Sequence, residues 1–359
     1  MGEKNAVSRV WFRLPRSSHF YILSQQSEPR GLHGFEALED SQGYLIVPFL
    51  PSAQCGALLL EPDVVETKSL PPLEVDVVEE GTCRRENEGT GLRRFASDEA
   101  LQRDLYSSAF GKVMEGLQRK DVEKVVLSRR LNLQLKDAST KLHAEKLFFR
   151  ACQTRPDSFV AYWNTPQTGQ WLVASPEPLL ERRGENWSTP ALAGTVPFEA
   201  GVSPQWSSKN LEEQALVARF VEAQLAAEAD EVKRSELFTV RSGNLFHLCN
   251  DFTFQLASPA RFRNLLARLH PTPAVCGSPR EEALQIILAA EASPRRFYAG
   301  FSGPLNLQGY TSLYVSLRCM TFSATRATLF AGGGIMPGSS EEEEWEETCH
   351  KLQTMLQLF

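Results

Sequence analysis

The feature that most constrains the fold is the irregular order of apolar segments along the chain. Short apolar runs such as "VWFRL", "FYIL" and "GALLL", which are typical of strands, occur among longer segments with helical periodicity. Strict alternation of the two types would favour a parallel sheet with crossover helices. Because that alternation is absent, the sequence predicts a layered α/β or α+β fold whose sheets are largely antiparallel.

The expected elements divide the chain into two parts within one domain. Residues 1–95 are rich in short apolar runs separated by Gly, Pro and Ser, which indicates strands joined by turns, and the polar stretch at 79–95 is a candidate loop. In residues 96–359 we expect helices at 97–119, 140–152, 207–229, 260–269 and 278–291 and a final helix after residue 340. Strands are expected there at 123–135, 158–164, 170–174, 296–302, 311–321 and 326–331.

Charge and cysteine usage exclude several classes of protein. The net charge of −6 leaves no general basic surface for nucleic acid or an anionic membrane. The seven cysteines include no CxxC pair, and the six histidines show no metal-ligand spacing. No apolar run approaches the roughly 18 residues of a membrane span, and the start lacks the apolar core of a signal peptide. We therefore expect a cytoplasmic protein without a nucleic-acid or membrane partner, either a monomer or a weak homodimer.

The final helix begins with six glutamates in seven residues, and they fall into two groups. Glu341–Glu343 would occupy the first turn, where the helix dipole favours acidic side chains. Glu344, Glu347 and Lys351 share one face that borders a stripe of apolar residues. This face could be a salt-bridge ladder at the surface or part of a functional site.

Another glutamate falls on the apolar face of an expected helix. The residues at i+3, i+4 and i+7 from Glu213 are Leu, Val and Phe, so Glu213 lies within that face while Glu212 points away. A buried, ionised carboxylate requires a cation. Glu213 could pair with a structural arginine, or it could act together with Glu347 as an oxygen ligand of Mg²⁺.

Three further stretches have residues suited to chemistry. Lys124 opens an apolar strand and could act as a base if it faces inward, although a lone lysine on a strand is usually solvated. Glu177 follows a Ser-Pro turn and suits a carboxylic acid kept protonated by burial, or a turn residue in water. Gly332–Gly334 follow a strand and permit close approach of a ligand, or a tight turn. They lack the spacing of a dinucleotide or P-loop motif.

In combination, nine motifs resemble the chorismate-utilising enzymes, the family of anthranilate, salicylate and isochorismate synthases, and most closely the isochorismate synthases. In chain order they are "KVVLSR", "ASPEPLLE", "LAGTVP", "SSKNLEEQALV", "LHPTPAVCG", "FYAGFSGPL", "VSLRCM", "LFAGGGIMPGS" and "EWEETCHKL". They run from about residue 120 to the C-terminus, whereas the first hundred residues resemble the family only in being rich in strands. The resemblance implies one α+β domain over residues 1–359, with two large, mainly antiparallel sheets flanked by helices. The active site would lie in the catalytic part, 96–359.

The resemblance also implies a role for each residue that matches a family motif. Lys124 would be the base that activates water, and Glu177 the general acid. A Mg²⁺ cofactor would be bound by Glu213, Glu344 and Glu347. The residues expected to bind the substrate chorismate or to line its pocket are Gly194, Thr195, His270, Ala274, Tyr298, Arg318, Gly333 and Lys351.

The implied reaction is the reversible, Mg²⁺-dependent conversion of chorismate to isochorismate for menaquinone or siderophore biosynthesis. Salicylate synthase, which would use the same Lys124 and then eliminate pyruvate, is the main alternative, although Ala274 resembles the isochorismate synthases. Enzymes that use ammonia commonly carry glutamine at the position of Lys124. A chorismate-binding paralogue without activity is the remaining alternative. Gln214 and Ser312 depart from residues common in the family, and both bear on substrate positioning.

Overall fold

The computed structural model describes residues 7–38, 41–52, 55–72, 95–118, 122–137, 139–198, 200–242 and 245–359. The candidate loop at 79–95 lies, apart from its last residue, outside these ranges.

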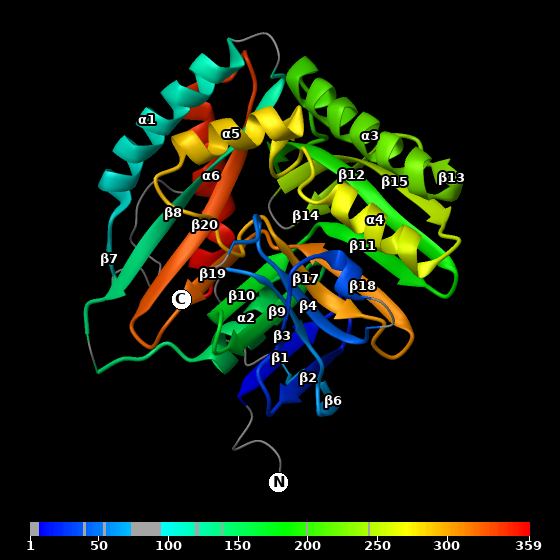
Figure 1. Ribbon diagram of the computed structural model, residues 1–359. Coiled ribbons are helices and arrows are strands. Elements are labelled where there is room, and N and C mark those ends of the chain that lie inside the picture. Colours follow the sequence, from blue (N-terminus) through cyan, green and yellow to red (C-terminus); the bar gives the residue numbers. More distant parts are fainter. Residues whose placement is uncertain are drawn as a thin grey trace.

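Two large sheets form the frame of the molecule (Figure 1). The first contains, in spatial order, β16 (Gly277–Ser278), β8 (Lys124–Leu135), β20 (Arg326–Ile335), β19 (Cys319–Phe322), β10 (Gly169–Ser175), β9 (Phe159–Thr165), β1 (Ser8–Arg13), β2 (His19–Gln25) and β6 (Val64–Ser69), with β7 (Phe95–Ser97) beside β8. The second contains β13 (Asp230–Arg234), β15 (Leu245–Gln255), β12 (Asn186–Pro197), β11 (Pro178–Arg183), β18 (Tyr310–Val315), β17 (Phe301–Leu305), β4 (Gly43–Val47), β5 (Ala57–Leu60) and β3 (Arg30–Leu32), with β14 (Phe238–Ser242) beside β15. All pairings between the described strands are antiparallel, which confirms the predicted fold class.

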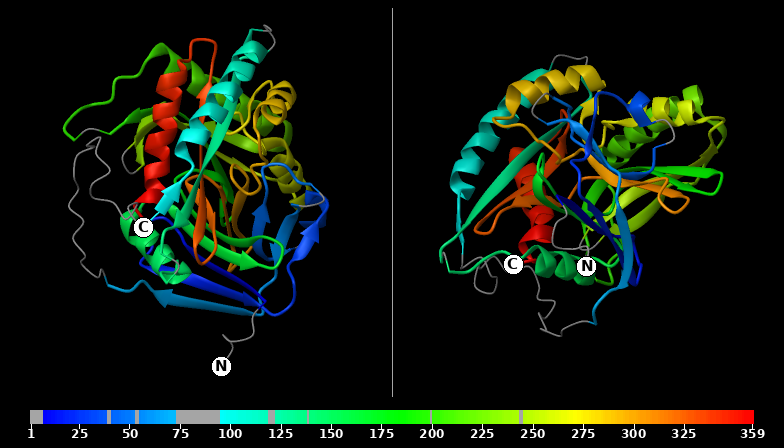
Figure 2. Two further views of the ribbon diagram at one scale, coloured as in Figure 1. Left: turned by 90° about the vertical axis from the view of Figure 1, so that its left-hand side faces the viewer. Right: turned by 60° about the horizontal axis from the view of Figure 1, so that its bottom comes forward.

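Helices flank both sheets (Figure 2). The described residues form α1 (Glu99–Leu117), α2 (Ala144–Thr154), α3 (Ser208–Glu228), α4 (Pro259–Leu269), α5 (Arg280–Ala290), α6 (Glu341–Leu356) and the short 3-10 helix η1 (Phe35–Leu38). Helices α1 and α5 pack on β8, α6 packs on β20, and α3 packs on β12 with α4 beside it. Within the described ranges, no helix combines the length and apolarity that a membrane crossing needs.

The chain passes between the two sheets at two short central turns. Strand β10 leads into β11 through Pro176 and Glu177, and β18 leads into β19 through residues 316–318. The backbone N–H of Val315 donates to the carbonyl oxygen of Glu177, and that of Ala174 donates to the carbonyl oxygen of Arg318, each at 3.0 Å. These two crossover turns therefore hold each other, and both deliver a charged residue to the space between the sheets.

Three sequence-based boundaries differ from the structure. The single strand expected at 311–321 is two strands in different sheets, and the change of direction uses a positive φ of 47° at Arg318. The strand expected at 296–302 begins only at Phe301, because Arg296 and Ala299 take φ values of 55° and 60° in the preceding turns. The sequence predicts no strands between residues 178 and 255, where the structure has β11 to β15, one half of the second sheet.

The strands of the N-terminal part extend both sheets of the C-terminal part. β1 pairs with β9 in the first sheet, and β4 pairs with β17 in the second. The apolar space between the sheets contains fully buried Trp163 and Trp171, and burial of a side chain of this kind contributes roughly 2 kcal/mol or more. A second apolar cluster lies between the first sheet and helices α2 and α6. The division of the domain at residue 95 stays a prediction.

The first prediction concerns Gly277, which pairs with the start of β8. A Cβ at Gly277 would overlap the carbonyl oxygen of Lys124 and lie 2.6 Å from the Cβ of Ala283, at a φ of 147°. Gly277→Ala should therefore lower the free energy of unfolding by about 3 kcal/mol, from overpacking and backbone strain together. Gly184→Ala is the matched control, because Gly184 also has a positive φ, of 63°, but has nothing within 4 Å of the added atom.

The control should lose only about 1 kcal/mol, the backbone contribution alone. Denaturant unfolding of the two variants measures the difference. Equal losses would mean that the backbone around Gly277 relaxes and that close packing there does not fix the position of Lys124.

Candidate active site

A pocket lies between the sheets, at the crossover turns. Its wall is made from β12, β15, β20, α3, α6 and both turns. Ten residues that the sequence had indicated line it: Glu177, Gly194, Thr195, Glu213, Ala274, Tyr298, Arg318, Gly333, Glu347 and Lys351. Residues from eight of the nine motifs thus meet in one cavity.

An ion pair beside the pocket joins β8 to α3; Glu213 lines the pocket, whereas Lys124 lies behind Glu213 and is not part of the wall. The Nζ of Lys124 lies 2.7 Å from Oε1 of Glu213, and their side chains are only 1% and 15% exposed. Burial alone would raise the pKa of Glu213, but the contact with Lys124 lowers it. Glu213 is therefore an anion whose cation is Lys124, and the exposed position of Glu212 confirms that only one of the two neighbours faces inward.

Glu177 supplies an acid on the crossover turn. Its side chain is buried, and burial raises its pKa to about 7, although Lys124, Lys351 and Arg318 oppose the shift. At neutral pH a large part of Glu177 therefore carries a proton. Burial lowers the pKa of Arg318 to about 10, so that guanidinium stays charged and can hold a carboxylate.

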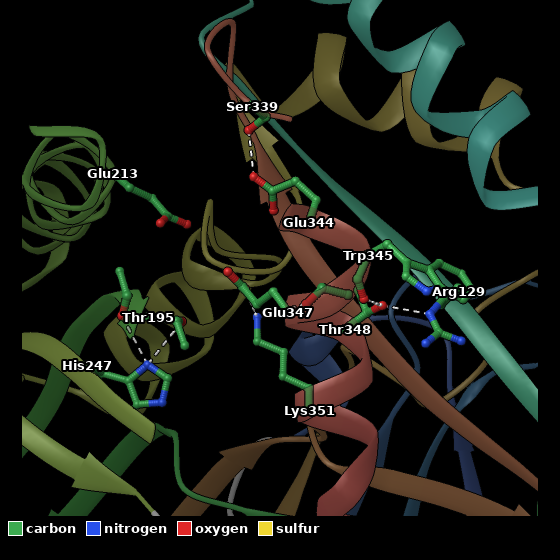
Figure 3. Close-up of polar contacts among 12 residues, drawn as sticks. Arg129, Thr195, Glu213, His247, Ser339, Glu344, Trp345, Glu347, Thr348 and Lys351 are labelled. Atoms are coloured by element: carbon green, nitrogen blue, oxygen red, sulfur yellow. Dashed lines mark hydrogen bonds and ion pairs between the residues drawn. The ribbon is translucent and has the colours of Figure 1, made fainter. Parts of the chain in front are cut away.

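Helix α6 brings Lys351 and Glu347 to the pocket wall and holds Glu344 buried beside it (Figure 3). Nζ of Lys351 donates to Oε1 of Glu347 at 2.5 Å and to the carbonyl oxygen of Gly332 at 2.9 Å. Oε1 of Glu344 accepts from Ser339 at 2.7 Å and also contacts Nζ of Lys209. The sequence left open whether the face with Glu344, Glu347 and Lys351 forms a salt-bridge ladder or part of a functional site. Lys351 and Glu347 form an ion pair, and both residues of this pair line the pocket.

The glycines expected to follow a strand lie inside β20, near its end, and allow these carboxylates to approach the backbone. A Cβ at Gly333 would lie 3.0 Å from Oε2 of Glu344, and one at Gly334 would lie 2.6 Å from Oε1 of Glu213. A side chain at either position would therefore push the carboxylates out of this arrangement. The three carboxylates of Glu213, Glu344 and Glu347 flank the same short stretch of backbone.

The donor atoms of this cluster fit a hard divalent cation. As arranged, no three His, Cys, Asp or Glu side chains in the described part of the chain form a ligand set, because each carboxylate contacts a lysine. Oε2 of Glu344, however, is buried and has no hydrogen-bond partner among the described residues. Burial and the nearby charge of Glu347 raise the pKa of Glu344. An unpaired carboxylate oxygen beside two further carboxylates is the type of site that Mg²⁺ occupies.

His247 lines the pocket, although the sequence analysis had not singled it out. Its Nδ1 lies 3.1 Å from the carbonyl oxygen of Gly194 and 3.3 Å from Oγ1 of Thr195 (Figure 3). Burial, with Arg318 and Lys351 nearby, lowers its pKa to about 3, so the ring is neutral. Because Nδ1 must donate to the carbonyl, Nε2 presents a lone pair. Strand alternation around "LFHLCN" was the signal that could have found it.

His270 does not line the pocket, and this expectation needs correction. Its Nε2 lies 3.1 Å and 3.2 Å from the carbonyl oxygens of Pro48 and Phe49, and its ring packs against Phe301. The histidine therefore ties α4 to the segment after β4. Gln214 bonds Asn250, and the hydroxyl of Ser312 bonds Glu181, so both departures from the family pattern also lie outside the pocket wall.

Comparison with known proteins places the chain in a family. A family model described as "Chorismate binding enzyme" matches residues 74–359. Isochorismate synthase EntC of Escherichia coli is 33% identical over 247 residues, which cover 66% of this chain and 62% of EntC. The chain thus matches less than two thirds of EntC. Isochorismate synthase MenF of Escherichia coli is 29% identical over an alignment that covers 94% of this chain and 81% of MenF.

Solved structures agree with this assignment at the level of fold. A putative 2,3-dihydroxybenzoate-specific isochorismate synthase, DhbC of Bacillus anthracis, superposes with a TM-score of 0.79 at 24% identity and covers 99% of this chain and 97% of that chain. MenF of Escherichia coli gives a TM-score of 0.77 at 22% identity, over 99% and 89% of the two chains. With the pocket, its charges and the family match taken together, the chain belongs to the chorismate-binding enzymes.

Proposed function

We propose that the chain is an isochorismate synthase, which interconverts chorismate and isochorismate. The observation that carries this proposal is an acid, Glu177, partly protonated near pH 7, in the wall of a pocket whose other wall residue Glu213 contacts the buried Lys124. An addition of water coupled to loss of a hydroxyl needs a base and an acid at two places on one substrate. The names of the relatives EntC, MenF and DhbC support the same activity.

The charges of the pocket suit a dianionic substrate. Chorismate carries two carboxylates, and Arg318 and Lys351 offer two cations at the wall. Lys351 is already held by Glu347 and by the carbonyl oxygen of Gly332, so its position is fixed before the substrate arrives. The ring of the substrate would then lie between Glu177 and the side of the pocket where Glu213 contacts Lys124.

The proposed step is an exchange of hydroxyl groups. Lys124, which is paired with Glu213 as a cation, must first release a proton to solvent; as a neutral amine it then takes a proton from a water molecule while the water oxygen forms a bond to ring carbon C2. Glu177 gives its proton to the C4 hydroxyl, which leaves as water while the two ring double bonds shift. One water enters and one leaves, so the reaction is an isomerisation. In the reverse direction Lys124 and Glu177 exchange the roles of base and acid.

The carboxylates around Gly333 would hold the divalent cation. Glu213, Glu344 and Glu347 are the proposed ligands of Mg²⁺, which would supply positive charge to a substrate carboxylate and would compete with Lys124 for Glu213. Glu213 is the anion in contact with Lys124, so a cation that took this carboxylate would leave Lys124 without its ion-pair partner. The low pKa of Glu213 keeps that carboxylate available as a ligand.

We also propose a cytoplasmic setting. The six described cysteines are all free thiols, which fits a reducing compartment. The product would feed menaquinone or siderophore biosynthesis, the processes that the relatives' names indicate. A monomer or weak homodimer remains the prediction for the assembly.

The second prediction tests the reaction itself. Purified protein incubated with chorismate and Mg²⁺ should accumulate isochorismate and release little pyruvate. It should also convert added isochorismate to chorismate, and added ammonia should not change the products. Lys124→Gln should lower kcat by about 100-fold or more, since it removes the base. Lys233→Gln, on exposed β13, is the control and should leave kcat unchanged. Chromatography of the products decides the outcome, and pyruvate released in proportion to the chorismate consumed would instead identify a salicylate synthase.

The third prediction concerns pH. Glu177 must be protonated to act as the acid, and its pKa is raised to about 7, so kcat/KM should fall as the pH rises through about 7. Glu177→Gln should lower kcat by about 100-fold or more and should lose this descending limb. Rates measured from pH 5.5 to 9 give both profiles. A descending limb that persists unchanged in the variant would assign it to another group.

The fourth prediction concerns the metal. Protein stripped with a chelator should be inactive with chorismate until Mg²⁺ is added. Glu213→Gln and Glu347→Gln should each raise the Mg²⁺ concentration for half-maximal rate by about tenfold or more, or abolish activity, because each removes a charged oxygen ligand. Glu212→Gln changes the exposed neighbour on the same helix and should behave as the wild type. Equal Mg²⁺ curves for the Glu212 and Glu213 variants would contradict the assignment.

A further inference from the structure

Each carboxylate proposed to bind the divalent cation contacts a lysine. The three pairs are Lys124–Glu213, Lys351–Glu347 and Lys209–Glu344. The reaction proposed above uses two of these lysines, one as the base and one as a cation for the substrate. It assigns no role to Lys209, which therefore brings a positive charge to this site that the reaction itself does not need.

Lys209 is the second residue of α3, one helical turn before Glu213 and on the same face. A cation in the first turn of a helix is opposed by the helix dipole, which favours negative charge there. Burial would also lower the pKa of this lysine, but the attraction of Glu344, Glu213 and Glu347 raises it. The acidic cluster, and not the helix, therefore stabilises the charge of Lys209.

Of the three lysines, Lys209 is held most loosely. Its side chain is 34% exposed, against 1% for Lys124 and 16% for Lys351. The ammonium of Lys351 has a second acceptor, the carbonyl oxygen of Gly332. Among the described residues, that of Lys209 contacts only the carboxylate of Glu344. Because a long, partly exposed side chain can carry its charged end into water, Lys209 can leave this contact without a buried charge of its own.

The carboxylate of Glu344 cannot follow, since its side chain is only 2% exposed. Its Oε1 accepts from Ser339 and Lys209, whereas its Oε2 has no hydrogen-bond partner among the described residues. A Cβ at Gly333 would lie 3.0 Å from this Oε2 and 3.6 Å from Oε1 of Glu347, so the two oxygens face the same piece of backbone. Lys209 thus neutralises Glu344 without occupying the oxygen beside Glu347.

We infer that Lys209 is an exchangeable counterion that sets the affinity of this site for divalent cations. Lys209 neutralises Glu344 when no divalent cation is bound, so that a buried carboxylate is not left unpaired. When the cation binds, Lys209 withdraws from Glu344 toward water, because the two positive charges repel each other. The ion pair must break first, so the affinity is lower than the carboxylates alone would give. This inference rests on the metal site proposed above.

The fifth prediction concerns binding of Mg²⁺ to the full chain without chorismate, measured by isothermal titration. Lys209→Met should lower the Kd for Mg²⁺ by about tenfold or more, because it removes the competing charge. Lys209→Arg keeps that charge and should bind Mg²⁺ about as the wild type does. Arg103→Met is the matched control. Arg103 is 32% exposed and pairs with Glu341 and Glu342, at 3.2 Å and 2.7 Å, which lie on the same helix but are not proposed ligands.

Thermal unfolding gives a second measurement. Without Mg²⁺, Lys209→Met should have a lower Tm than the wild type, because Glu344 loses its cation. Mg²⁺ should then raise the Tm of this variant by more than it raises that of the wild type. An unchanged or weaker affinity for Mg²⁺ in Lys209→Met would overturn the inference, and so would an equal gain in Arg103→Met.

Glu347→Gln separates this inference from the metal site on which it rests. If Glu347→Gln weakens the binding of Mg²⁺ but Lys209→Met does not tighten it, the metal site stands and only the role of Lys209 fails. If none of these proteins binds Mg²⁺, both the site and the role of Lys209 are refuted.

Discussion

Two backbone hydrogen bonds between the crossover turns join the sheets at the centre of the molecule. Through them the N–H groups of Val315 and Ala174 hold the carbonyl oxygens of Glu177 and Arg318. A strand that leaves one sheet for another must break its ladder, and the freed groups must be satisfied elsewhere. Here each turn satisfies the other. The same geometry turns the acid Glu177 and the cation Arg318 toward one pocket, so the fold and the site depend on one constraint.

Around this centre, the site keeps its charges in pairs. Lys124 with Glu213 and Lys351 with Glu347 are the pairs that line or underlie the pocket. Removing one member of a buried pair leaves an uncompensated charge, which costs about 3–5 kcal/mol. If the proposed dianionic substrate and divalent cation bind together, the net charge of the pocket does not change, because their charges are equal and opposite. A pocket built from paired charges can therefore be stable when empty and still bind charged ligands.

The sequence was most informative where local periodicity decides the outcome. Counting along one helix distinguished Glu213 from Glu212, and the apolar stripe around Trp345 oriented the last helix. It failed where contacts between distant segments decide. The break at Arg318 exists because β18 and β19 belong to different sheets, and His270 points to carbonyl groups more than 220 residues away in the chain. Neither partner is visible in the local pattern.

Helix α6 connects the pocket between the sheets with the packing against α1 and β8. Glu347 faces this pocket, whereas the ring of Trp345 lies between Arg129, at 3.6 Å, and Tyr106, at 5.3 Å. Figure 3 shows Arg129 and Glu213 on opposite sides of this helix. Packed interiors do not deform freely, so a shift of Trp345 must be accommodated by the turn that also holds Glu344 and Glu347. The stacking of Arg129 on Trp345 therefore helps to fix the carboxylates of Glu344 and Glu347, although Arg129 itself does not line the pocket between the sheets.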